Sequence, residues 1–379
     1  MDFQWSDSQV AFRKRVADFL AAELPADWET LACQSPGSQA LTDFSLVFCP
    51  RLAAAGLLVP HWPREYGGED ATPWEHFILG EELWRVGEPR GPQYYNVNWL
   101  GPAIMRYGTP AQKEQHLSLI AAGKAVWCQG FSEPSAGSDL AALRTRAEPV
   151  DGGYRITGSK IWTSYASLAE FCFLLARTAS GKSGVSVFLV PMSTPGIEVR
   201  AIPSVVGKGD LHEVFFTDAF VPGNCRLGED GQGWEVVRYA LHYERVGIPR
   251  YTLARAILER AVGELKQSGA FGNPLIRTRA AQTYAICEAA RFLVYRVIDQ
   301  RAKMQPQSAE TSVARVAVVA AERSVGEFAL DFLPDAMRGM GSKLVDTHHR
   351  RAMTAGIAAG AAEIQLNLIA DSLLNLPRA

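Results

Sequence analysis

The sequence has no apolar run long enough to cross a membrane and no strong charge of either sign. Its N-terminal segment, MDFQWSDSQVAFRKRVADFL, interrupts apolar residues with charged ones at helical spacing, which predicts neither a signal peptide nor a membrane span. The formal net charge over 379 residues is −2. That balance gives no electrostatic basis for binding nucleic acid or an anionic membrane surface.

Cysteine is also sparse, and no two cysteines have C-x-x-C spacing. The six residues are Cys33, Cys49, Cys128, Cys172, Cys225 and Cys287. This usage is typical of free thiols in a reducing cytoplasm rather than of disulfides or zinc. His348 and His349 are adjacent, and no further ligand has suitable spacing, so we expect no metal.

What is present is an ordinary globular composition, 47% hydrophobic and 21% charged, and enough length for two or three packed units. Residues 1–122 read as helical, with a helix start at Thr109 and a stop at Gly123. Residues 123–229 hold short β-branched and aromatic stretches that predict a small antiparallel β-domain. Residues 230–379 predict a helix bundle, with helices at 233–267, 274–303, 309–332 and 350–374.

Two stretches of the middle region carry chemistry: WCQGFSEPSAGSDLAALRTRAE (127–148) and GGYRITGSKIWTSYASLAEF (152–171). Phe131 and Trp162 supply flat apolar walls, and Gly137 lets backbone N–H groups approach an anion. Hydroxyl donors come from three serines, Ser132, Ser138 and Ser164. Such a set suits an aromatic cofactor with polar edges and a phosphate. A surface turn and a core tryptophan would explain the same residues.

These stretches, on this helical, β, helical plan, resemble the acyl-CoA dehydrogenase family. The resemblance covers nearly the whole chain, including FRKRVADFL (12–20), YGTPAQKEQHL (107–117) and EIQLNLIA (363–370). It implies an α+β multidomain fold with an N-terminal helical domain, a middle antiparallel β-barrel and a C-terminal four-helix bundle. It also implies FAD, bound between the barrel and the bundle.

The matched residues that would hold FAD are Gln129, Phe131, Ser132, Gly137, Ser138, Trp162, Thr163 and Ser164. By resemblance, the first three would line the flavin, and residues 162–164 would cover its ring and polar edge. Ser138 would reach either the pyrophosphate or the pantetheine arm of the substrate.

The family reaction removes a proton from Cα of an acyl thioester and a hydride from Cβ. The site must stabilise the developing enolate oxygen and keep a carboxylate base in a dry cavity. Most members carry this base in a Tyr-Glu-Gly-Thr segment, where AGIAAGAAEIQ (355–365) has Ala359 instead. The isovaleryl and long-chain types carry it on a bundle helix just before an arginine. That place corresponds to Glu244, before Arg245.

Glu244 is therefore our candidate base, although helical spacing also allows a solvated charge at the border of an apolar stripe. The stripe expected from that spacing is Trp234, Val237, Leu241 and Ile248. Tyr243 and Arg245 are expected beside the substrate, with packing as the alternative for the tyrosine. The backbone N–H of Ala359 would help to hold the thioester oxygen.

A second departure concerns the pyrophosphate, because Ser268 stands where many relatives have an arginine. Arg277 or Arg279 is a candidate replacement. These departures resemble a bacterial subgroup that acts on steroid side-chain and other bulky acyl-CoA thioesters, several of whose members are heterotetramers. The resemblance implies an acyl-CoA or acyl carrier protein thioester, an electron-transfer flavoprotein, and a homo-oligomer or heterotetramer. A flavin monooxygenase or oxidase on the same fold, and a non-catalytic partner subunit, are the alternatives.

Overall fold

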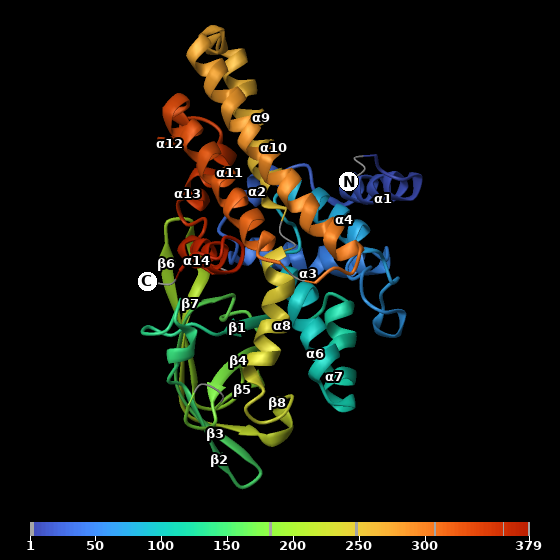
Figure 1. The fold of residues 1–379 in the computed structure, drawn as a ribbon, viewed down its shortest axis with the longest axis vertical. Coiled ribbons are helices and arrows are strands. Elements are labelled where there is room, and N and C mark those ends of the chain that lie inside the picture. Colours follow the sequence, from blue (N-terminus) through green and yellow to red (C-terminus); the bar gives the residue numbers. More distant parts are fainter. Residues whose placement is uncertain (1–3, 182–183, 247–248, 307, 359, 378–379) are drawn as a thin grey trace. The chain divides into compact units, whose positions relative to one another are not determined.

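The computed structural model describes residues 4–181, 184–246, 249–306, 308–358 and 360–377; the side chains of residues 208 and 242–246 are outside the description. The chain forms two compact units. We call residues 35–70 and 90–244 the sheet unit. Residues 1–34, 71–89 and 245–379 form the helical unit. Figure 1 labels the helices and strands of both.

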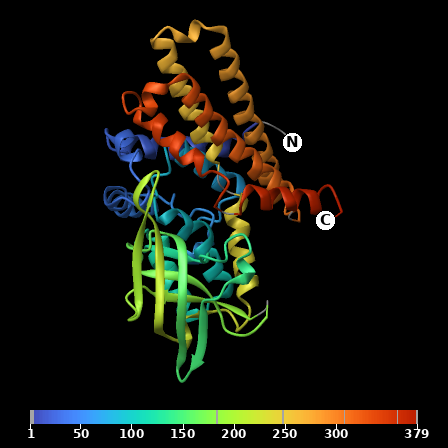
Figure 2. The same ribbon diagram turned by 90° about the vertical axis from the view of Figure 1, so that its left-hand side faces the viewer.

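In the described ranges, the sheet unit is built on eight strands. They are β1 (Trp127–Gly130), β2 (Arg146–Val150), β3 (Gly153–Ser164), β4 (Phe171–Arg177), β5 (Val185–Pro191), β6 (Ile197–Ser204), β7 (Gly207–Pro222) and β8 (Arg226–Leu227). The hydrogen-bonded order is β6-β7-β3-β2-β4-β5-β8, with β1 beside β4. Figure 2 shows the long strands of this path side by side. Its apolar core includes Ile156, Leu174, Phe188 and Phe216.

The expectation of a closed antiparallel barrel is wrong. Among the described residues, the path runs from β6 to β8 and no pairing joins these two ends. Two of the pairings, β1 with β4 and β2 with β4, are parallel. The physical reason is the crossover from β1 to β4, which brings strands of the same direction together, whereas alternation of residue types cannot distinguish the two pairings.

Helices complete the sheet unit: α3 (Gln39–Ala54), η1 (Arg64–Tyr66), α5 (Gln93–Tyr95), the π-helix η2 (Asn96–Leu100), α6 (Gly101–Tyr107), α7 (Pro110–Ala121), η3 (Leu140–Ala142), η4 (Gly223–Cys225) and α8 (Gly233–Val246). The predicted start of α7 is confirmed. The Thr109 hydroxyl accepts from the backbone N–H of Gln112, and Gly123 has a positive φ of 68° just after the helix.

The helical unit contains α1 (Asp7–Glu23), α2 (Trp28–Ala32), α4 (Pro73–Arg85), α9 (Arg250–Gln267), η5 (Ala270–Gly272), α10 (Pro274–Ala302), α11 (Glu310–Phe332), α12 (Pro334–Met337), α13 (Lys343–Met353) and α14 (Ala362–Ser372). Four of these, α9, α10, α11 and α13, pack on one another, and the first three run alongside each other in Figure 1. Their shared core includes Leu258, Ala290, Val325 and Phe328. This is the predicted bundle.

Two predicted helices are wrong in extent. The stretch 233–267 forms two helices, since α8 ends at Val246 and α9 begins at Arg250 after Pro249; proline lacks the N–H that a continuous helix needs. The stretch 350–374 also divides, because α13 ends at Met353 and α14 begins at Ala362. None of the described helices combines the length and apolar character needed to cross a bilayer.

Candidate flavin and substrate site

The first segment of the candidate site begins at β1. Gln129 pairs with Phe173 across the parallel ladder, and its side-chain Oε1 accepts a hydrogen bond of 2.9 Å from Trp99 Nε1. Within the described part of the chain, no protein acceptor takes the Gln129 amide NH₂, so both of its donors remain for a ligand. Phe131 is buried and lies against Phe173, with 6.0 Å between ring centroids. Ser132 follows, half-buried.

The second segment is the end of β3, where the chain presents an exposed tryptophan. The pairing of β3 with β7 shifts register between Lys160 and Thr163, and Trp162 adopts a positive φ of 59°. Its side chain is 57% exposed. Left-handed backbone is uncommon for a bulky residue and concentrates at functional sites. The interpretation of Trp162 as a core residue is therefore wrong, and its exposed ring offers a surface on which a planar group can stack.

Thr163 and Ser164 lie differently, as successive side chains of a strand do. Thr163 is fully buried, and its Oγ1 has no hydrogen-bond partner among the described residues. Ser164 is half-buried. The Ser164 hydroxyl is therefore the more accessible of the two to a ligand, although the resemblance implies that both lie at the flavin.

The Gly/Ser-rich turn, residues 134–138, lies between the two segments in sequence. Glu133 and Ala136 exchange backbone hydrogen bonds of 2.9 and 3.0 Å, which makes residues 133–136 a tight turn. Gly137 and Ser138 follow it, both exposed. A Cβ added at Gly137 would meet nothing within 4 Å, so the fold itself does not require glycine there and the turn is open to a ligand.

Two aromatic residues that organise these segments were not predicted from the sequence. Trp99 lies on the π-helix η2 and binds Gln129. Tyr95 is buried, donates to the Trp127 carbonyl and has its hydroxyl 3.4 Å from the Ser164 carbonyl. Short π-helical segments are frequent at functional sites. The stretch QYYNVNWL, rich in aromatic and amide residues, was the available indication.

The candidate base and substrate residues occupy the last turn of α8. The helix buries Val236, Val237 and Ala240, while Trp234 and Leu241 are half-buried. The side chains of Tyr243, Glu244 and Arg245 lie outside the described residues, as does Ala359.

Two of the three residues considered for the pyrophosphate, Ser268 and Arg279, have local partners. Ser268 caps the end of α9, and its hydroxyl donates to the Leu265 carbonyl at 3.2 Å. Arg279 forms an ion pair of 3.4 Å with Asp331. Arg277 is exposed.

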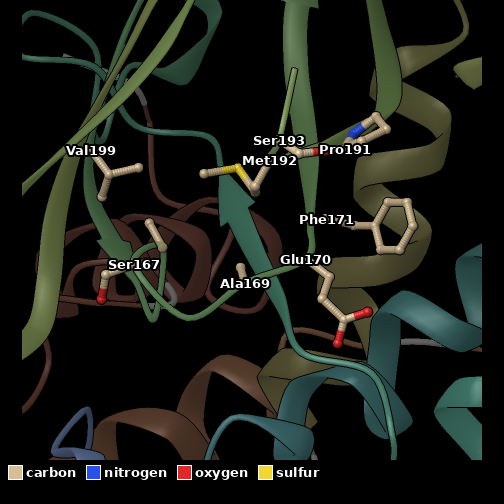
Figure 3. A pocket seen from close by; sticks show the side chains of 9 residues that line it. Ser167, Ala169, Glu170, Phe171, Pro191, Met192, Ser193 and Val199 are labelled. Atoms are coloured by element: carbon tan, nitrogen blue, oxygen red, sulfur yellow. The ribbon is translucent and has the colours of Figure 1, made fainter. Parts of the chain in front are cut away.

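The sheet unit also has an open cavity of about 600 Å³ beyond the end of β3. Its wall consists of Ala166, Ser167, Ala169, Glu170, Phe171, Pro191, Met192, Ser193 and Val199, which Figure 3 shows from close by. None of the predicted site residues lines it. No group of three or more His, Cys, Asp and Glu in the described ranges could hold a metal ion.

Three family models match the chain along its length: the acyl-CoA dehydrogenase N-terminal domain at residues 6–124, the middle domain at 128–219 and the C-terminal domain at 231–374. The acyl-CoA dehydrogenase IpdE1 of Mycobacterium tuberculosis (strain ATCC 25618 / H37Rv) is 34% identical over 382 residues, which cover 97% of each chain. The boundaries expected at 122 and 229 stay a prediction.

Solved structures are similar to this chain over its full length. The Tcur3481-Tcur3483 steroid ACAD has a TM-score of 0.92 and 28% identity, with 100% of each chain covered. The ChsE4-ChsE5 complex from Mycobacterium tuberculosis has a TM-score of 0.89 and 26% identity, again with full coverage.

The chain therefore belongs to the acyl-CoA dehydrogenase family. It is an FAD-dependent oxidoreductase that forms an α,β double bond in an acyl-CoA thioester. The site residues fit this cofactor, because an exposed aromatic ring, an amide NH₂ that no acceptor in the described ranges takes, accessible serine hydroxyls and an open glycine turn match an aromatic ring system with polar edges and a phosphate chain.

Proposed function

We propose that this enzyme dehydrogenates a bulky acyl-CoA thioester, with a branched or steroid-derived acyl group. The observation that carries the substrate class is the full-length likeness to a structure described as a steroid ACAD, at a TM-score of 0.92. Acyl carrier protein is the alternative carrier, because it presents the same pantetheine arm.

Glu244 is the proposed base. Position 244 continues, at helical spacing, the row of α8 that contains the buried residues Val237 and Ala240. A carboxylate that faces a dry substrate cavity would be desolvated, which favours its neutral form and makes it a stronger base. Tyr243 and Arg245, its neighbours, would contact the substrate, and the Ala359 backbone N–H would hold the thioester oxygen as negative charge develops there.

Each proposed flavin residue would make a different contact with the cofactor. Trp162 would stack on the ring system, Gln129 would donate its amide NH₂ to the polar edge, and Ser132 and Ser164 would donate hydroxyls. Gly137 and Ser138 would approach the pyrophosphate or the pantetheine arm, while Phe131 and Thr163 support the two segments from the interior. When bound, FAD supplies the hydride acceptor.

We also propose a multimeric enzyme that passes electrons to an electron-transfer flavoprotein. The ChsE4-ChsE5 complex supports a heteromeric enzyme with a related chain, for which we propose a heterotetramer, and a homo-oligomer is the alternative. Exposed apolar side chains at and after α14, namely Leu366, Leu373, Leu374 and Leu376, are consistent with a surface covered by another subunit. All six cysteines are free thiols, which supports a cytoplasmic location.

The test is the visible spectrum of the protein purified alone, and again with a related chain, during anaerobic addition of straight, branched and steroid acyl-CoA thioesters. Bleaching of the flavin bands by the bulky thioesters alone supports the proposal. Equal or faster bleaching by straight short chains contradicts the substrate class. Fast reaction of the reduced flavin with oxygen would favour the oxidase or monooxygenase instead.

A further inference from the structure

A buried ion pair links the two segments that carry the proposed flavin residues. Glu133 follows Ser132, and Lys160 on β3 precedes Trp162 by two residues. Lys160 Nζ lies 2.8 Å from Glu133 Oε1, and the two side chains are 0% and 5% exposed. The segments are therefore joined at a point that solvent does not reach.

The same two side chains also hold the backbone around them. Lys160 Nζ donates a second hydrogen bond, of 3.1 Å, to the Phe131 carbonyl. The Glu133 carboxylate accepts from the backbone N–H of Arg144 at 2.6 Å and of Thr145 at 2.9 Å. Charge-assisted hydrogen bonds are short and directional, so they fix residues 131–133 against β3 and against residues 144–145.

A backbone hydrogen bond completes the connection. The N–H of Ile161 donates to the Ser132 carbonyl at 2.9 Å. Ile161 stands between Lys160 and Trp162, so a displacement of the ion pair would be transmitted to Ser132 on one segment and Trp162 on the other. These are the residues to which we assign a hydroxyl donor and the stacking surface.

Stability alone is a weak explanation for the pair. Desolvation makes buried charges costly, and well-packed apolar residues of similar volume are often as stable. Burial lowers the pKa of Lys160, although Glu133 opposes the change. Burial would raise the pKa of Glu133, but Lys160 and the donors around the carboxylate outweigh it and bring the pKa below its ordinary value. The carboxylate is thus ionised at neutral pH.

We infer that Lys160 and Glu133 are positioning residues of the flavin site, which set the place of Ser132 relative to Trp162 and thereby the affinity for FAD and the reduction potential of the bound flavin. This inference rests on the flavin-residue roles proposed above. Neither side chain touches the cofactor in this account.

The experiment compares Lys160→Met and Glu133→Gln with wild type in the full-length protein. The methionine keeps an unbranched chain without the charge, and the glutamine keeps the shape of the acid. Arg200→Met is the matched control, because Arg200 pairs with Glu198 at 2.7 Å on the same sheet but both side chains are about 60% exposed. For each protein we would measure the thermal midpoint of the FAD-free form, the Kd for FAD by fluorescence titration well below that midpoint, and the reduction potential of the bound flavin.

The expected result is a Kd raised roughly tenfold or more by Lys160→Met, the scale usual for groups that hold a ligand-contacting residue in place. Glu133→Gln should have a smaller effect, because it still offers one acceptor oxygen. A changed reduction potential in either variant, with Arg200→Met like wild type, supports the inference. A lower thermal midpoint with wild-type Kd and potential would overturn it, because the pair would then be structural only. If Lys160→Met does not fold, the Kd and potential of Glu133→Gln decide.

Trp162→Ala separates this inference from the site on which it rests. If Trp162→Ala binds FAD as tightly as wild type, the proposed flavin residues are misplaced. If it weakens FAD binding while Lys160→Met and Glu133→Gln leave both Kd and potential unchanged, only the positioning inference fails.

Discussion

Replacing His348 with glutamine should make the protein less sensitive to mild acid. His348 lies on α13 and is 4% exposed, and its Nε2 is 3.2 Å from the Glu322 carbonyl. Burial lowers the pKa of its imidazole from 6.5 to about 4, although the carbonyl favours the charged form in part. The folded protein therefore keeps this side chain neutral at pH values where the unfolded chain binds a proton.

The sign and size of the effect follow from that difference. Because the folded pKa is lower than the unfolded one, the unfolded state gains protons first as the pH falls below 6.5, and the free energy of unfolding decreases until about pH 4. The full difference between the unfolded and folded pKa values corresponds to about 3 kcal/mol in the free energy of unfolding. By pH 5, His348 alone lowers that free energy by about 2 kcal/mol. Glutamine can donate to the same carbonyl and does not titrate.

The assay is urea unfolding at pH 7.5 and pH 5, followed by circular dichroism. Wild type should lose about 2 kcal/mol more than His348→Gln between these two pH values. If His348→Gln and wild type lose the same free energy, the assignment of a buried neutral imidazole is refuted. His116, whose pKa burial also lowers to about 4, contributes equally to both proteins.

Three further changes test other parts of the structure. Trp99→Phe removes the donor to Gln129, and the loss of about 1 kcal/mol should raise the Kd for FAD about fivefold in a fluorescence titration; an unchanged Kd would mean that this bond does not orient the amide. Phe328→Ala empties a fully buried position of the helical core and should lower the free energy of unfolding by about 3–5 kcal/mol in urea, whereas a loss below about 1 kcal/mol would contradict the packing. Thr109→Ala removes the cap of α7 and should lower the free energy of unfolding in urea by about 1 kcal/mol. Thr109→Ser keeps the capping hydroxyl and should keep the wild-type stability; an equal loss in both variants would contradict the cap.

The fold was predictable where local chemistry decides it. The cap at Thr109 and the helices that became α10 and α11 follow from turn residues and apolar periodicity. The open mixed sheet could not be predicted in the same way, because the parallel pairing of β1 with β4 depends on contacts between residues more than 40 positions apart. Pro249 was sufficient to predict that the long helix divides before Arg250. The apolar stripe expected on both sides of Pro249 favoured one continuous helix instead.

The site was predictable in its residue types and less so in their orientation. The motif brought Phe131, Ser132 and Trp162 into the candidate set, but the left-handed backbone that exposes Trp162 depends on a register shift between β3 and β7. Thr163 is on the buried face for the same reason. Trp99 was indicated only by the aromatic and amide residues of QYYNVNWL, because a hydrogen bond between η2 and β1 cannot be inferred from either stretch alone.

Whether this chain carries its own flavin and its own base is tested by the anaerobic rate of flavin reduction in wild type and in Glu244→Gln, with an acyl-CoA thioester that bleaches the wild-type flavin. Glutamine keeps the size of the side chain and removes its basicity. We expect wild-type FAD content and a reduction rate lower by roughly a hundredfold or more in the variant. Reduction at the wild-type rate would contradict this expectation and would place the base elsewhere.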